Sequence, residues 1–137
     1  MFKASRRPNG LDISLSSTLE NIDRADKNTK GFLHGMGLEA EAFAIRVAMR
    51  EGILNAIRHG SCGDRNRIIR YSLRLENNSL IMEIEDEGSG FDWRTSLENK
   101  HLSNSGSGRG LSIMKAYFAD VTFNDKGNKL ILRKKIS

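Results

Sequence analysis

The sequence predicts an α+β fold: a two-layer sandwich in which a mostly antiparallel sheet carries helices on one face. Three observations lead to this prediction. Several short segments alternate apolar and polar residues with period two, the pattern of half-buried strands. Longer segments have the start and stop signals of helices. Turn residues separate neighbouring strand segments, which favours antiparallel hairpins.

The first half of the chain predicts one strand and two helices. Leu11–Leu15 alternates with period two and is expected to be a strand. Ser17–Glu20 matches a capping box, which would open a helix that runs to about His34. The glycines of Gly35–Gly37 then break this helix. A longer helix is expected from about Glu39 to His59, where Gly60 would end it.

The second half predicts further strands and one more helix. Alternating segments precede and follow an Asn77-Asn78 turn, and a hairpin is expected around Asp125–Gly127. A helix should start near Gly110 and carry Leu111, Ile113, Met114 and Phe118. The expected strands are 69–75, 80–84, 121–124 and 130–134.

The size and composition indicate one globular domain. The chain has 137 residues, of which 38% are apolar and 28% are charged, so we expect residues 1–137 to form a single domain. No apolar run approaches the roughly 20 residues that span a bilayer, and Met1–Gly10 lacks the apolar region of a secretory signal. Cys62 is the only cysteine, which favours a reducing, cytoplasmic location.

The formal net charge of +5 raises the question of a nucleic-acid, acidic-protein or polyphosphate partner. The basic residues are spread along the chain and cluster only at Arg6-Arg7 and Arg133–Lys135. No basic stretch is interleaved with aromatic residues, so solvated termini explain the clusters better than nucleic-acid binding.

The long helix carries the first candidate site residues. At about 100° per residue, Phe43, Val47, Leu54 and Ile57 share an apolar stripe, whereas Glu51, Asn55 and His59 share another arc with the small residues Ala44, Ala48 and Gly52. Small residues around polar ones leave room for a ligand. A carboxylate and a carboxamide one turn apart offer oxygens, which magnesium prefers. The alternative is an ordinary exposed polar pair.

The second candidate site is the segment Asp86–Phe91. Period two places Asp86 on the same strand face as Leu80, Met82 and Ile84, so its carboxylate should point inward and needs a donor. The exocyclic amine of adenine would supply one, and Gly88 and Gly90 would allow the backbone to approach a flat base. The alternative is a simple strand-ending turn.

The third candidate site is a glycine-rich segment before the last predicted helix. Free N–H groups at a helix N-terminus suit a phosphate, although the pattern is neither a Walker A loop nor a Rossmann motif. Arg109 would contact a phosphate or remain in solvent, and a lid hinge is the alternative for the whole segment. The candidate residues are Gly106, Ser107, Gly108, Arg109, Gly110 and Leu111.

Together, these three motifs resemble the GHKL ATPase superfamily, which includes histidine-kinase catalytic domains, gyrase and MutL-type proteins. The strings Glu51–Gly60 and Gly110–Met114 are more narrowly similar to the anti-sigma-factor serine/threonine kinases. The resemblance covers about Leu11 to Ile136 and implies a Bergerat-type ATP-binding fold.

The resemblance also implies roles for individual residues. Asn55 would hold magnesium, Asp86 would recognise adenine with Gly88 and Gly90 shaping its site, and the glycine-rich segment would wrap the phosphates of ATP. Glu51 would act as the general base in the transfer of the γ-phosphoryl group. The family usually has a glycine-threonine pair where this chain has Gly127-Asn128, so Asn128 would replace the threonine that supports an adenine-site water.

By this resemblance the protein is expected to be a regulatory protein kinase whose partners are a sigma factor and a STAS-domain antagonist that carries the target serine. Two alternatives remain: a non-catalytic, ATP-dependent protein-binding module, and an ATPase subunit of a signalling complex. Glu51 favours the kinase, because a pure binder needs no base at that position. The sequence leaves a homodimer open and does not identify the partner.

Overall fold

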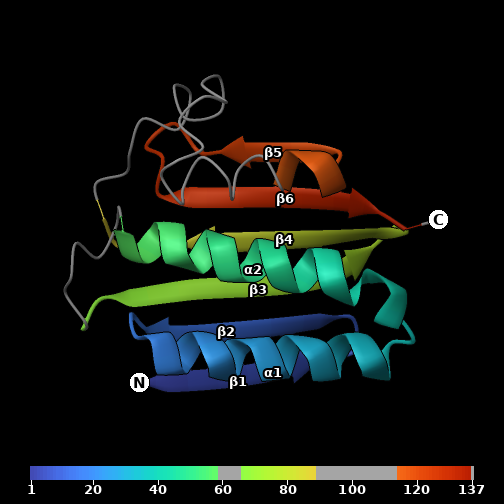
Figure 1. The fold of residues 1–137 in the computed structure, drawn as a ribbon, viewed down its shortest axis with the longest axis horizontal. Coiled ribbons are helices and arrows are strands. Elements are labelled where there is room, and N and C mark those ends of the chain that lie inside the picture. Colours follow the sequence, from blue (N-terminus) through green and yellow to red (C-terminus); the bar gives the residue numbers. More distant parts are fainter. Residues whose placement is uncertain (59–65, 89–113, 137) are drawn as a thin grey trace.

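The computed structural model describes residues 1–58, 66–88 and 114–136. These residues form a six-stranded sheet of order β1-β2-β3-β4-β6-β5, with every neighbouring pair antiparallel, and the helices cover one of its faces (Figure 1). The predicted α+β fold is confirmed. The elements are β1 (Phe2–Arg7), β2 (Gly10–Ser16), α1 (Leu19–Gly35), η1 (Glu39–Glu41), α2 (Ala42–Ala56), β3 (Ile68–Glu76), β4 (Ser79–Glu85), β5 (Asp120–Phe123) and β6 (Lys129–Lys135).

Strand β1 is an element that sequence reasoning missed. It pairs along its whole length with β2, and the two strands are joined by a turn at Pro8-Asn9. Every residue of β1 except the half-buried Phe2 is exposed. Because this edge strand buries so little, its sequence lacks the apolar alternation by which half-buried strands are recognised.

Helix α1 begins one residue later than the predicted capping box implies. Thr18 is the N-cap, and its side chain accepts a hydrogen bond from the Asn21 N–H at 3.3 Å. The Ser17 hydroxyl instead donates to the Arg67 carbonyl at 3.0 Å. Ser17 therefore fastens the chain before α1 to the segment that precedes β3, while Thr18 satisfies a free N–H of the helix.

The predicted long helix is divided into a short 3₁₀ turn, η1, and the α-helix α2. Its apolar stripe was predicted wrongly: Phe43 is 66% exposed, and Val47 and Leu54 are only half-buried. The small residues face the sheet instead. A Cβ on Gly52 would lie 2.4 Å from Cδ1 of Ile84, so the absence of a side chain lets α2 approach β4 closely.

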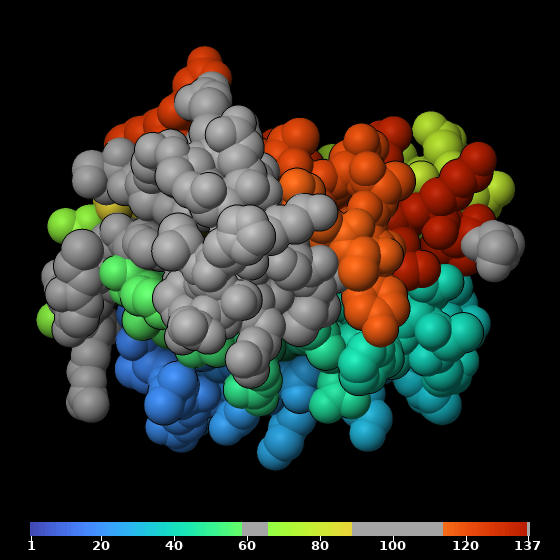
Figure 2. Space-filling model, turned by 45° about the horizontal axis from the view of Figure 1, so that its top comes forward, coloured from blue at the N-terminus to red at the C-terminus, as the bar shows by residue number. Residues whose placement is uncertain are grey.

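The other predicted strands are confirmed as β2, β3, β4, β5 and β6. Asn77 and Asn78 join β3 and β4 with φ values of 50° and 62°, a left-handed pair that asparagine tolerates well. Residues 114–117 are helical, whereas the predicted start of this helix near Gly110 lies outside the described residues. The rings of Phe43 and Tyr117 meet edge to face at 5.9 Å, and Figure 2 shows this segment, in orange, beside the start of α2.

The hydrophobic core fills the space between the helices and the sheet. Tyr71 of β3 is fully buried there, and its hydroxyl lies 2.7 Å from the Thr29 hydroxyl of α1. Thr29 in turn donates to the Ala25 carbonyl at 2.8 Å. No helix within the described ranges is long and apolar enough to cross a membrane. The core thus fixes α1 and α2 on the sheet and positions the candidate site between α2 and the ends of β4 and β6.

Candidate functional site

A narrow cavity lies between the C-terminal half of α2 and the ends of β4 and β6. Its volume is about 10 Å³, room for roughly one water molecule. The cavity brings together Asn55, Asp86 and Asn128, which come from three separate elements and were all predicted as site residues. Its described lining is Gly52, Asn55, Ala56, Ile84, Asp86, Phe123, Gly127, Asn128 and Leu130.

Asn55 is buried, with only 4% of its surface exposed. Its Oδ1 accepts a 3.4 Å hydrogen bond from Nη1 of Arg58, whereas its Nδ2 has no hydrogen-bond partner among the described residues. A buried amide left without a partner costs about 1–3 kcal/mol, so this is an unusual place for an asparagine with only a structural role. The alternative of an exposed polar pair with Glu51 is therefore wrong for Asn55.

Glu51 lies one helical turn before Asn55 and is half-buried. The spacing of four residues makes the two side chains neighbours on α2. Glu51 is absent from the described lining of the cavity. It takes part in no ion pair within the described part of the chain. The structure thus places Glu51 beside the cavity rather than in its wall.

Asp86 follows the last residue of β4, and its side chain lines the cavity together with Ile84, as period two predicted. Its carboxylate accepts a 2.7 Å hydrogen bond from the Gly88 N–H. The strand-ending turn that was the alternative is therefore present as well. Burial raises the pKa of the Asp86 carboxyl, because the charged form loses hydration, and the Gly88 hydrogen bond opposes this shift.

Asn128 connects Asp86 to the β5–β6 hairpin. The Asp86 N–H donates to the Asn128 carbonyl at 2.9 Å, and Nδ2 of Asn128 donates to the Asp86 carbonyl at 3.0 Å. Oδ1 of Asn128 accepts from Nδ2 of Asn124 at 2.7 Å. Asn128 is thus bonded to both the N–H and the C=O of Asp86. The oxygen and the nitrogen of the Asn128 side-chain amide each have a partner in the protein.

The remaining predicted residues divide into two groups. Gly88 is buried at the turn after Asp86. The others lie outside the described residues: Gly90, Gly106, Ser107, Gly108, Arg109, Gly110 and Leu111. Sequence reasoning had not assigned Phe123 or Leu130 to the site, although the expected β5–β6 hairpin brings both into its wall.

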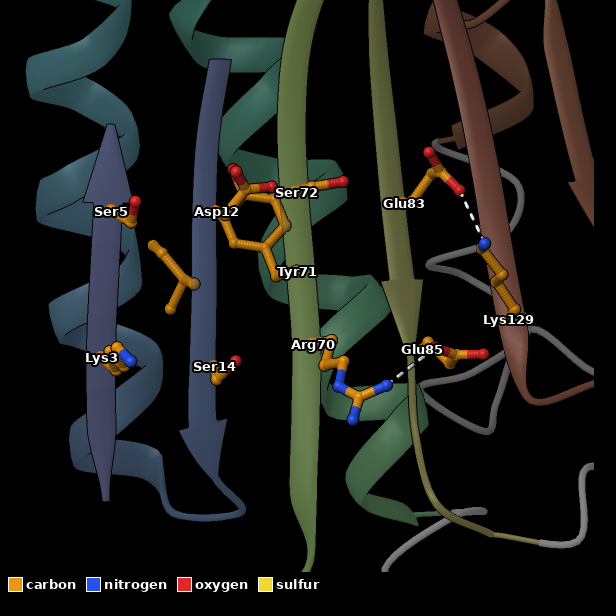
Figure 3. A pocket seen from close by; sticks show the side chains of 11 residues that line it. Lys3, Ser5, Asp12, Ser14, Arg70, Tyr71, Ser72, Glu83, Glu85 and Lys129 are labelled. Carbon is orange, nitrogen blue, oxygen red and sulfur yellow. Dashed lines mark ion pairs between the residues drawn. The ribbon is translucent and has the colours of Figure 1, made fainter. Parts of the chain in front are cut away.

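The uncovered face of the sheet has a larger hollow, of about 540 Å³ (Figure 3). Its charges largely pair within the face: Glu83 contacts Lys129 at 2.9 Å and also Arg74, and Arg70 lies 3.8 Å from Glu85. None of the predicted site residues that the structure describes lines this hollow. Asn55, Asp86 and Asn128 therefore gather on the helix side of the sheet.

The chain is similar over most of its length to several curated anti-sigma F factors. The protein from Clostridium perfringens is 26% identical, over 94% of this chain and 98% of its own length. The protein from Geobacillus kaustophilus is also 26% identical and covers 94% of both chains. The protein from Geobacillus stearothermophilus is 25% identical, over 88% of this chain and 86% of its own length.

A model of the histidine kinase-like ATPase domain matches residues 15–134, from the end of β2 to the end of β6. The matched range contains Asn55, Asp86 and Asn128, which meet at the cavity. Superfamily and anti-sigma branch were both expected from the motifs, and both are confirmed. The chain belongs to the histidine kinase-like ATPase domain family.

Proposed function

We propose that this protein is a Mg-ATP-binding regulatory serine/threonine kinase of the anti-sigma-factor type. It would phosphorylate a serine on a protein antagonist, with a STAS domain by resemblance, and sequester a sigma factor in the cytoplasm. The observation that carries the proposal is the buried Asn55 amide, whose Nδ2 has no partner in the described part of the chain, in a cavity shared with Asp86. The names of the curated relatives support the regulatory role.

The residues at the cavity fit the two ligand groups that the family implies, a magnesium ion and the adenine base of ATP. Oδ1 of Asn55 accepts a 3.4 Å hydrogen bond from Arg58 in this structure and would exchange that donor for a hard cation such as magnesium, which accepts a carboxamide oxygen while it keeps several waters. Asp86 offers a desolvated carboxylate that can accept a hydrogen bond from the amino group of adenine. The cavity has room for only about one water, so a base enters only if the residues that line it separate.

We propose the following roles for the chain's own residues. Asn128, itself held by Asn124, fixes the Asp86 peptide, and the Gly88 N–H donates to the Asp86 carboxylate, so the carboxylate is oriented before a ligand arrives. Glu51, beside Asn55 on α2, would accept the proton of the attacking serine hydroxyl. Gly106, Gly108 and Gly110 would offer backbone N–H groups to the phosphates. When bound, magnesium would supply positive charge that neutralises the phosphate oxygens.

The second candidate is a non-catalytic module that binds ATP and sequesters its partner. One observation favours it: Glu51 is absent from the described lining of the cavity, whereas Asn55 and Asp86 are present. On this hypothesis the nucleotide orders the binding surface and no phosphate is transferred.

A comparison of wild type with Glu51→Gln separates the two candidates. Glutamine keeps the size of the side chain and removes its basicity, so ATP affinity measured by calorimetry should stay within a few fold. Transfer of radiolabelled γ-phosphate to a serine of the co-purified protein partner should fall by roughly a hundred- to ten-thousand-fold. Equal transfer by both proteins would refute Glu51 as the base. An absence of transfer by wild type to its authentic partner would favour the binding module.

The nucleotide assignment has its own test. Asp86→Ala and Asn55→Ala should each fold, as judged by circular dichroism, and each should bind Mg-ATP at least tenfold more weakly, the effect of about 1.4 kcal/mol. A control is Asp125→Ala, an exposed acidic residue on the β5–β6 turn that does not line the cavity. Unchanged affinity in a folded Asp86→Ala variant would remove the adenine assignment and leave the family membership untouched.

A further inference from the structure

Strand β1 is one edge of the sheet, and β2 is its only neighbour among the described strands (Figure 1). Figure 3 shows it beside β2 with Lys3 and Ser5 on the uncovered face. The strand is exposed from Lys3 to Arg7. An exposed edge strand presents a row of backbone groups that can pair with a strand of another chain.

The hydrogen-bond pattern shows which backbone groups face outward. The Ser16 N–H donates to the Met1 carbonyl at 2.8 Å, so Met1 is bonded to β2. In an antiparallel pair every second residue is bonded to the partner strand, and the residues between direct their N–H and C=O to the opposite side. The residues bonded to β2 are therefore Lys3, Ser5 and Arg7, and those with outward-facing groups are Phe2, Ala4 and Arg6.

Positive charge lies on both faces of this edge. Lys3 projects on the uncovered face of the sheet (Figure 3). Arg6 projects on the helix face, where its Nη2 donates to the Asn28 carbonyl of α1 at 3.4 Å. Lys27, the residue before Asn28, is exposed on α1. Neither Lys3, Arg6 nor Lys27 forms an ion pair within the part of the chain that the structure describes.

The carboxylates nearby are already paired. Asp12 of β2 accepts from Arg7 at 2.8 Å, and Glu20 of α1 accepts from Arg24 at 3.1 Å. The edge therefore has a net positive charge that its own residues do not neutralise. A partner strand that brings carboxylates to both of its faces would neutralise it.

We propose that β1 is a docking edge for an extended, acidic segment of a protein partner, which adds to the sheet as a further antiparallel or parallel strand. Backbone hydrogen bonds to Phe2, Ala4 and Arg6 supply the pairing, and the cations on both faces select acidic side chains. A second copy of this chain fits less well, because its β1 brings no carboxylate: in an antiparallel pair centred on Ala4, Lys3 would lie opposite Ser5 of the copy and Arg6 opposite Phe2.

The probe is a synthetic peptide of repeated Val-Glu-Glu, in which neighbouring glutamates fall on opposite faces of a strand. Its control is the same peptide with every glutamate replaced by lysine. Amide spectra of the ¹⁵N-labelled protein should show shifts and slower exchange at Phe2, Ala4 and Arg6 with the acidic peptide only. The N–H groups of Lys3, Ser5 and Arg7 should be protected with and without it, because they are bonded to β2.

Two pairs of variants test the backbone and the charge separately. Ala4→Pro removes an outward-facing N–H that the β1–β2 ladder does not use, a substitution that edge strands tolerate, and it should abolish binding, whereas Ala4→Val should retain it. The double variant Lys3→Glu/Arg6→Glu should bind the acidic peptide about tenfold more weakly. Lys135→Glu, on β6 and separated from β1 by three strands, should bind it like wild type.

Several outcomes would overturn the proposal. One is equal binding of the acidic and basic peptides, and another is a set of amide shifts confined to the uncovered sheet face around Ser14 and Arg70. A third is unimpaired binding by Ala4→Pro in a protein with a folded spectrum. If Ala4→Pro does not fold, unchanged binding of the acidic peptide by Lys3→Glu/Arg6→Glu would likewise overturn the proposal. Self-association in analytical ultracentrifugation that Ala4→Pro abolishes would assign the edge to a second copy instead.

Discussion

Gly52 lets α2 lie close to β4, and replacing it with alanine should reveal how closely the two elements are packed. The new Cβ would lie 2.4 Å from Cδ1 of Ile84 and 3.2 Å from Cδ2 of Leu130. Both partners are buried side chains of the sheet, with 2% and 4% of their surface exposed. Ile84 would have to rotate into occupied space or α2 would have to move outward, because the core has few voids.

Two effects of opposite sign decide the magnitude. Adding a methyl group to a packed core destabilises a protein by typically 1–3 kcal/mol. Replacing glycine by alanine inside a helix stabilises it by about 0.5–1 kcal/mol. Gly52→Ala should therefore lower the free energy of unfolding by up to about 2.5 kcal/mol. Since Ile84 and Leu130 also line the cavity, the substitution should weaken ATP binding in addition.

The matched control is Gly35→Ala at the exposed end of α1, where an added Cβ would meet no atom within 4 Å. This substitution should be neutral or stabilise by up to about 1 kcal/mol. Urea unfolding followed by circular dichroism measures the change in the free energy of unfolding for both variants. The two variants share the same substitution and differ only in whether the new methyl group is buried or exposed. If Gly52→Ala is as stable as Gly35→Ala, the close approach of α2 to β4 is not a constraint on this fold, and the reasoning from the contact distances is wrong.

Three further predictions concern a hydrogen bond in the core, the pH dependence of the protein's stability, and the candidate site. Tyr71→Phe should lower the free energy of unfolding, measured with urea, by about 0.5–1.5 kcal/mol. Because the Thr29 hydroxyl donates to the Ala25 carbonyl, the Tyr71 hydroxyl is the donor to Thr29, and the substitution removes that hydrogen bond. The bidentate hydrogen bonds from Arg46 lower the pKa of the Asp26 carboxyl below the ordinary value of an aspartate. The unfolded state therefore binds the proton first, so this stabilisation is present above about pH 4 and is lost as pH falls through the lower folded-state pKa; the acid-induced loss should be smaller in Asp26→Asn. Asn128→Ala removes the side chain that donates to the Asp86 carbonyl. Hydrogen exchange at the Asp86 N–H, which is bonded to the Asn128 carbonyl, should accelerate, and Mg-ATP affinity should fall. A variant that binds Mg-ATP normally would limit Asn128 to a structural role.

Strands with one buried face were predictable from the sequence, because burial imposes an alternation that the residues reveal. β3 and β4 and the Asn77-Asn78 turn between them illustrate this, since the turn requires left-handed backbone that asparagine accepts. β1 was missed for the converse reason: it is exposed on both faces, and its pairing depends on β2 rather than on its own residues.

The site was partly predictable because its residues combine a local pattern with an unusual environment. The phase of Asp86 on its strand indicated correctly that it faces inward, and the arc that Asn55 shares with Gly52 is the one that lines the cavity. The apolar stripe through Phe43 was assigned wrongly, because the spacing of apolar residues does not reveal how closely two backbones approach. Small residues such as Ala48 and Gly52 make that approach possible, and the structure shows them against the sheet.

The order of strands in the sheet also has a consequence for folding kinetics. The pairs β1–β2, β3–β4 and β5–β6 are hairpins of neighbouring strands, whereas β2–β3 and β4–β6 join strands that are distant in the sequence. Hairpins form within microseconds, so closure of the two distant pairs should limit the folding rate. Because closure entropy grows slowly, by about 0.6 kcal/mol for each doubling of a connection, the chain between β4 and β5 can change in length at little cost. The framework that holds Asn55 and Asp86 can therefore be kept while this connection changes in length.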